Sequence, residues 1–96
     1  MIIAKVVGSV VSTIKDEALH GSKLLVLREA SPDAHDLGDP FVAVDTVGAG
    51  TGELVLVARG SAARQTRQTN DAPVDSVIIA VIDSLDVEGT ETFRKS

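Results

Sequence analysis

The sequence predicts an all-β protein that folds as a small, closed or nearly closed five-stranded β-barrel with one short helix. Five aliphatic segments of strand length are separated by turn-rich pieces, and only one short stretch has helical character. Strands do not alternate with helices, as a βαβ fold would require. The 96 residues can fill one hydrophobic core, so a single domain is expected.

The first strand is expected at residues 2–13, a segment rich in Val and Ile in which Gly8 marks a bulge or a sharp bend. Four more strands are expected at residues 23–29, 41–45, 53–59 and 77–83. The intervening pieces at residues 15–21, 31–40 and 48–52 are rich in turn residues.

The one helix is expected directly after Gly60, with Ser61 as its N-cap. Residues 66–75 are polar and predict a surface loop. The polar segment from residue 88 onward is expected to fray, so the chain divides into a barrel at residues 1–87 and a C-terminal tail at residues 88–96.

Two strands carry more apolar side chains than the inside of a barrel can hold. Residues 77–82 and 54–58 are apolar throughout, whereas a strand with one wet face alternates apolar with polar residues. Burying an aliphatic side chain contributes roughly 1.5–3 kcal/mol, so three outward residues would matter against a total stability of about 5–15 kcal/mol. A neighbouring subunit is the favoured cover, and Ile79 is assigned to that contact; cover by the helix and long loops of the same chain remains the alternative.

Composition excludes several classes of protein. There is no cysteine, so a disulfide framework, a thiolate zinc site and a thiol nucleophile are excluded. The first residues lack the basic region of a secretory signal, and no apolar run approaches the ~20 residues that span a bilayer. We therefore expect a soluble, cytoplasmic protein that does not bind membranes.

The segment 47–53, Val-Gly-Ala-Gly-Thr-Gly-Glu, does not fit a nucleotide-binding loop. A dinucleotide fingerprint needs another glycine where Glu53 stands and must open a helix, whereas this segment opens a strand. It also lacks the Gly-Lys-Ser/Thr of a P-loop. A tight connection with glycines at positive φ is the favoured interpretation. Glycines would also let backbones crowd together around a symmetry axis.

No constellation predicts catalysis, a metal or a cofactor. The two histidines, His20 and His35, both fall in predicted loops, and residues 33–36 lack a second histidine or cysteine at ligand spacing. No base is placed to activate a serine. The acids near strand ends are expected to make ion pairs and turn hydrogen bonds: Asp45, Glu53, Asp75 and Asp83. A ring that binds a metal or a small molecule remains a distant third class.

Binding of single-stranded nucleic acid is the alternative function, because small five-stranded barrels often do this. Such sites stack bases on aromatic side chains in a basic groove. This chain has a formal net charge of −5, no Trp or Tyr, and only Phe41 and Phe93. Three arginines in mid-chain offer a thin basis for phosphate contact: Arg59, Arg64 and Arg67.

Five strings, in order along residues 1–87, resemble the vertex proteins of bacterial microcompartments, the small shell proteins of carboxysomes and of ethanolamine- and propanediol-utilising organelles. They are residues 5–13 (Lys-Val-Val-Gly-Ser-Val-Val-Ser-Thr), 21–25, 42–53 with its glycine segment, 60–64 (Gly-Ser-Ala-Ala-Arg) and 71–83. Ala80 departs from the pattern, because the family often has glycine there.

The resemblance implies a barrel related to the oligonucleotide-binding (OB) fold, assembled as a homopentamer that closes the fivefold vertices of an icosahedral shell. It implies hexameric shell proteins as partners, no cofactor and no catalysis. By the same resemblance, Gly48, Ala49 and Gly50 lie close to the ring axis, beside a narrow opening. Arg64 and Asp75 match family positions and are assigned to the contact between subunits.

Overall fold

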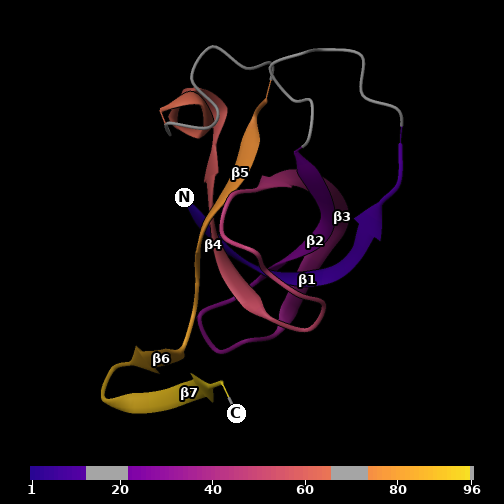
Figure 1. The fold of residues 1–96 in the computed structure, drawn as a ribbon. Coiled ribbons are helices and arrows are strands. Elements are labelled where there is room, and N and C mark those ends of the chain that lie inside the picture. The colour runs from indigo at the N-terminus through magenta and orange to yellow at the C-terminus, as the bar shows by residue number, and fades with distance from the viewer. Residues whose placement is uncertain (13–21, 66–73, 96) are drawn as a thin grey trace.

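The structure, a computed structural model, describes residues 1–12, 22–65 and 74–95. Its centre is a closed barrel with the strand order β1-β2-β3-β5-β4, which confirms the predicted fold class (Figure 1). The five strands are β1 (Ile2–Val10), β2 (Lys23–Ala30), β3 (Asp36–Asp45), β4 (Leu54–Arg59) and β5 (Ser76–Val81).

Neighbouring barrel strands are antiparallel except β3 and β5, which run parallel and pair only through Val44 with Val77 and Asp45 with Ile78. In β1 the register against β2 shifts between Val6 and Gly8. The bulge predicted at this glycine is therefore confirmed. A bulge bends a strand and increases its twist, which helps a five-stranded sheet to close.

The third strand is longer than the sequence predicted. It begins at Asp36, not at residue 41, and residues 36–43 pair with β2 alone. Pro40 lies opposite Arg28 in a part of β3 that pairs with no second strand, and proline is tolerated on such an edge. The Arg28 guanidinium also donates to the Gly38 carbonyl oxygen at 2.7 Å, which ties the two strands together.

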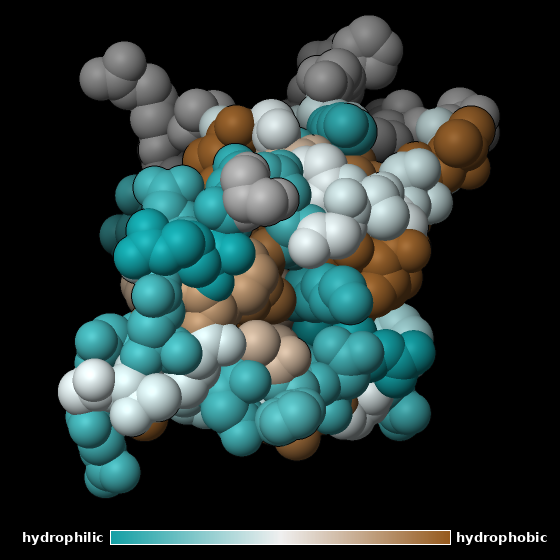
Figure 2. Space-filling model, turned by 90° about the horizontal axis from the view of Figure 1, so that it is seen from below, coloured by the Kyte–Doolittle hydropathy of each residue, from teal (hydrophilic) through white to brown (hydrophobic). Residues whose placement is uncertain are grey.

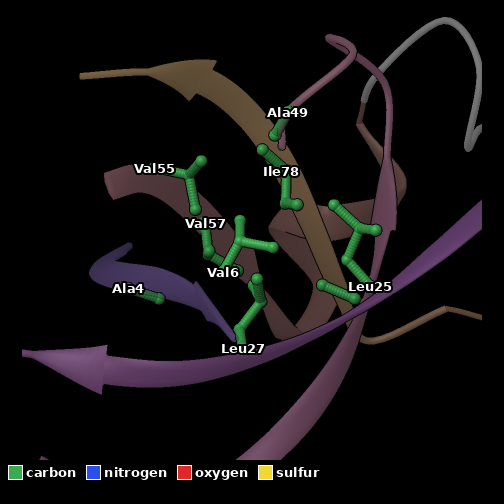
Figure 3. Packing of buried hydrophobic residues seen from close by; sticks show 9 residues of the cluster. Ala4, Val6, Leu25, Leu27, Ala49, Val55, Val57 and Ile78 are labelled. Atoms are coloured by element: carbon green, nitrogen blue, oxygen red, sulfur yellow. The ribbon is translucent and has the colours of Figure 1, made fainter. Parts of the chain in front are cut away.

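The barrel interior holds nine small aliphatic side chains that are almost fully buried. Figure 3 shows how they converge from the strands and from the β3–β4 loop: Ala4, Val6, Leu25, Leu27, Ala43, Ala49, Val55, Val57 and Ile78. Successive inward residues are two apart, as in Val55 and Val57 of β4, because side chains alternate across a strand. The residues between them point outward.

The predicted helix is present as a short 3-10 helix, η2 (Gly60–Arg64). Its N-cap is Arg59, with no capping hydrogen bond from a side chain, so the assignment of Ser61 as N-cap was wrong. Gly60 has a φ of +62°, a conformation that glycine adopts without strain, and the chain turns there directly from β4 into the helix. Within the described residues, no helix has the length and apolar character needed to cross a membrane.

A hairpin of β6 (Ser84–Val87) and β7 (Thr90–Arg94) follows the barrel, although the segment from residue 88 onward was expected to fray. Glu88 and Gly89 have φ values of 53° and 82° and form its turn. Positive φ at both central residues is the geometry of the two-residue turns that suit the twist of a hairpin. The hairpin spans residue 87, and the division of the chain at that position stays a prediction.

Much of the outward apolar surface of β4 and β5 is covered within the chain, contrary to the favoured expectation. Ala63 of η2 packs with Val77 and Ala58, which are 0% and 4% exposed. The hairpin residues Leu85 and Phe93 pack against a second outer cluster, which consists of Ala30, Leu54 and Ile82. The alternative left open by the sequence thus holds in part, and less apolar surface remains for a neighbour to cover.

Candidate functional site

The loop between β3 and β4 is organised by the carboxylate of Asp45, the last residue of β3. Its Oδ1 accepts hydrogen bonds from the amides of Val47 (3.0 Å) and Gly48 (3.1 Å), and its Oδ2 accepts one from Ala49 (3.0 Å). Three convergent amides suit a carboxylate, which accepts hydrogen bonds on both oxygens. The loop therefore has a defined shape before any partner binds.

A second carboxylate, that of Glu53, closes the other end of the loop. Its Oε1 accepts from the Gly50 amide at 2.6 Å, and its Oε2 lies 2.7 Å from the Lys95 ammonium. Backbone bonds also tie this end to β1: the Gly52 amide donates to the Val6 carbonyl oxygen, and the Val6 amide donates to that of Glu53. The expected turn hydrogen bonds and ion pair are confirmed for Asp45 and Glu53.

The contact between Glu53 and Lys95 shifts the pKa values of both groups. The Lys95 ammonium, followed by the Gly50 amide, holds the pKa of Glu53 below its ordinary value. The Glu53 carboxylate in turn raises the pKa of Lys95. Each partner thus stabilises the charged form of the other.

The three residues assigned to the ring axis, Gly48, Ala49 and Gly50, differ in their exposure to solvent. Gly48 and Gly50 are exposed, and Gly48 has a φ of +76°. The Ala49 side chain is 1% exposed and packs into the barrel core near Ile78 (Figure 3). Ala49 therefore anchors the loop, and only its neighbours offer side-chain-free surface. Their position relative to a ring axis stays a prediction.

The residues assigned to subunit contact are spread over β5, its approach and η2. Asp75 is exposed and lines a hollow with Leu24, Val42 and Val44, and its carbonyl oxygen accepts from the Gly60 amide at 2.9 Å. Ile79 is half-buried and packs against the outer cluster beside η2. Arg64 ends η2, but its side chain lies outside the described part of the structure.

Both aromatic residues of the chain, Phe41 and Phe93, pack against other residues of the chain. The guanidinium of Arg59 lies over one face of the Phe41 ring, 4.3 Å from its centroid, a contact that was not predicted from the sequence. Phe93 packs in the outer cluster under the hairpin. Both aromatic rings thus make contacts within the chain, which does not favour base stacking on them.

The acidic turn at residues 33–36 is a hydrogen-bonded surface turn. The Ser31 hydroxyl donates to the Asp33 carboxylate, and this bond, followed by the charge of His35, lowers the pKa of Asp33. The His35 ring lies 3.6 Å from Asp33, and both side chains are exposed. Within the described residues no group of acids and histidines has the arrangement of a metal site. His20 and Arg67 lie outside the described residues.

Comparison with known proteins gives one consistent family. A family model described as "Ethanolamine utilisation protein EutN/carboxysome" matches residues 1–83. The chain is 45% identical over 95 residues to the carboxysome shell vertex protein CcmL of Synechococcus elongatus, covering 99% of this chain and 96% of that protein. It is 38% identical to the microcompartment shell vertex protein EutN of Escherichia coli, covering 99% and 100%.

Solved structures agree with this assignment. The chain superposes on a structure titled "Carboxysome Subunit, CcmL" with a TM-score of 0.92, at 44% identity and full coverage of both chains. A structure titled as the GrpN pentameric microcompartment shell protein of Rhodospirillum rubrum gives a TM-score of 0.82 at 41% identity, covering 91% and 99%. The resemblance noted in the sequence is thereby confirmed, and the chain belongs to the EutN/carboxysome family of microcompartment shell vertex proteins.

Proposed function

We propose that this chain is a structural subunit of a bacterial microcompartment shell in the cytoplasm, and that five copies form a ring at each vertex. The observation that carries the proposal is the match over 91% of the chain to a relative whose structure is titled pentameric. A shell of hexagonal tiles closes only where fivefold units let the sheet bend. The partners of the ring are therefore hexameric shell proteins.

The same proposal assigns the chain neither catalysis nor a cofactor. Its conspicuous glycine loop is held by two carboxylates of its own chain, Asp45 and Glu53, whose described hydrogen bonds and ion pair serve the fold. A loop that is held rigid in this way suits a structural role. Gly48 and Gly50 would line a narrow opening at the ring axis, and Arg64 and Asp75 would stabilise the subunit contact.

Light scattering on the purified protein tests the ring directly. The expected mass is that of five chains of 10.0 kDa each, in line with the pentameric title of the relative. A mass of one chain at micromolar concentration would refute the ring.

Co-assembly tests the role at the vertex. A hexameric shell protein expressed alone should give open sheets or tubes in electron micrographs, and addition of this chain should give closed polyhedra. If closed particles form equally well without the chain, it does not act at the vertices. In a filter-binding assay at low salt, where phosphate contacts are strongest, retention of single-stranded DNA would instead favour the alternative function.

A further inference from the structure

One side of the barrel carries outward aliphatic side chains that lie outside the hydrophobic clusters, apart from Leu24, which packs against the cluster beside η2. On the outer surface of β1, β2 and β3, Val10 pairs with Leu24 and Val26 with Val42 across adjacent strands. Val10, Val26 and Val42 belong to none of the three hydrophobic clusters, and Val42 is 46% exposed. We call Val10, Leu24, Val26 and Val42 the β2–β3 face.

The outer surface of β4 and β5 carries a smaller apolar strip. Leu56 of β4 and Ile79 of β5 point outward and are half-buried, each at the margin of a different outer cluster. Their strands, β4 and β5, run between η2 and the β6–β7 hairpin (Figure 1). We call Leu56 and Ile79 the β4–β5 face.

The two faces lie on different strands of the barrel, although Leu24 and Ile79 both pack against the cluster beside η2. In the closed order β1-β2-β3-β5-β4, β2 has β1 and β3 as neighbours, and β4 and β5 complete the barrel. A ring with more than two subunits needs a head-to-tail contact, in which one patch of a subunit meets a different patch of the next. This chain presents two unlike apolar patches of that kind.

The size of the molecule favours the same two sides. It measures 44 × 24 × 24 Å. In Figure 1, β5 runs from the end near η2 to the hairpin at the other end. A standard interface takes about 800 Å² from each partner. An end 24 Å across is too small for this, whereas a side 44 Å long is large enough. On the face seen from below, apolar surface is broken up by hydrophilic residues (Figure 2), which is unlike a broad apolar interface.

From these observations we propose that the β2–β3 face of one copy docks on the β4–β5 face of the next, between its η2 and its hairpin. This inference rests on the proposed function, because only a ring calls for a head-to-tail contact. It assigns Val42 and Ile79 to the two different sides of one interface. It also places Asp75, which lines the hollow beside Val42, at the edge of the β2–β3 face.

The proposal is tested with two variants that each place a carboxylate on one face. Val42→Asp and Ile79→Asp should each lose the ring and sediment as single chains, because a docked carboxylate would lack a partner. Mixed in equal amounts, the two variants should form a dimer, because each still has the intact face that the other needs. Dimers cannot grow further, since the remaining faces both carry Asp.

Controls separate this inference from the proposed function. Leu37→Asp lies on the same strand as Val42 with similar exposure, 44% against 46%, but outside the face, and it should keep the ring. Circular dichroism checks folding, and Ile79→Glu, whose longer stem lets the carboxylate reach water, replaces Ile79→Asp if that variant unfolds.

Three results would overturn the head-to-tail contact while leaving the ring intact. They are a ring formed by Val42→Asp, loss of the ring in Leu37→Asp, and a mixture that sediments as single chains at every concentration. A wild-type protein that is itself monomeric would instead overturn the proposed function.

Discussion

The carboxylate of Glu53 joins the glycine loop to the C-terminal end of the described chain. One oxygen accepts from the Gly50 amide at 2.6 Å, and the other lies 2.7 Å from the ammonium of Lys95, just after β7. Residues more than forty positions apart are thus connected through one side chain. The hairpin, whose part from residue 88 onward was expected to fray, is therefore linked to the loop that the family resemblance places at the ring axis.

Replacement of Lys95 by Gln should loosen this loop. The variant keeps most of the side-chain length but removes the charge that holds Glu53, so the Gly50 amide should exchange with solvent faster than in wild type. The effect on overall stability should be small, because both side chains are partly exposed and salt screens them. Hydrogen exchange followed by NMR measures the loop, with Lys23→Gln at the exposed start of β2 as control. Equal exchange at Gly50 in all three proteins would contradict the link.

The same pair predicts a pH dependence at both ends of the range. Because the pKa of Glu53 is lowered in the folded chain, its contribution to stability is present at neutral pH and is lost as the pH falls through that lowered pKa. Because the pKa of Lys95 is raised, its contribution is lost as the pH rises through the raised value. The difference in Tm between wild type and Lys95→Gln should therefore be largest near neutrality and vanish in strong acid and strong base.

Replacement of Asp45 by Asn should destabilise the loop and the fold together. One of the two oxygens that accept the amides of Val47, Gly48 and Ala49 becomes an NH₂ group, which faces a donor. We expect a loss of about 1–2 kcal/mol in the free energy of unfolding. Urea unfolding followed by far-UV circular dichroism measures it, because the chain has no Trp or Tyr to report by fluorescence. Asp39→Asn, on the exposed part of β3, is the control and should change little.

The strands were predictable where aliphatic residues run together, and the fold class followed from them. Gly8 marked the bulge because a glycine inside a Val-rich strand has few other uses. The first half of β3 was missed because Gly38 and Pro40 are turn residues by preference. There the ladder with β2 outweighs local preference, and pairing between strands distant in sequence cannot be seen in either strand alone.

The hairpin was missed although a signal was present. Leu85 and Val87 alternate with polar residues, and Glu88-Gly89 follows, a pattern that predicts a strand and a turn. The loop was better predicted, because an aspartate before a glycine-rich piece commonly accepts hydrogen bonds from the backbone after it. The bond from Glu53 to Lys95 was not predictable, since it depends on where the hairpin packs.

Alanine at Gly48 and at Gly50 should separate the needs of the fold from those of the ring. At Gly48 the φ of +76° is unfavourable for alanine, and Gly48→Ala should cost about 1 kcal/mol in the free energy of unfolding. At Gly50 an added Cβ meets only the Glu53 carboxylate, at an ordinary 3.5 Å, so Gly50→Ala should leave the fold unchanged.

If neighbouring loops crowd around an axis, Gly50→Ala should weaken assembly in spite of its intact fold. Light scattering over a dilution series, together with circular dichroism, measures the two effects separately. A Gly50→Ala variant that assembles as tightly as wild type would show that this loop has free space in the ring.

Truncation of Phe93 tests whether the hairpin contributes to the barrel. The phenyl group of Phe93 packs in the outer cluster with Leu54 and Ile82. Phe93→Ala should therefore lower the free energy of unfolding by about 1–3 kcal/mol. The loss is smaller than for a fully buried Phe because this side chain is half-buried. Thr90→Ala, exposed at the start of β7, is the matched control.

Both variants should be compared by urea unfolding at equal protein concentration, since assembly also stabilises the fold. Phe93→Ala should in addition raise the hydrogen exchange of β7 amides toward that of an open strand, because a two-stranded hairpin alone is barely stable in water. If Phe93→Ala unfolds at the same urea concentration as Thr90→Ala, the packing of the hairpin does not stabilise the barrel. Leu54, which is 3% exposed, would then owe its burial to the remaining cluster residues.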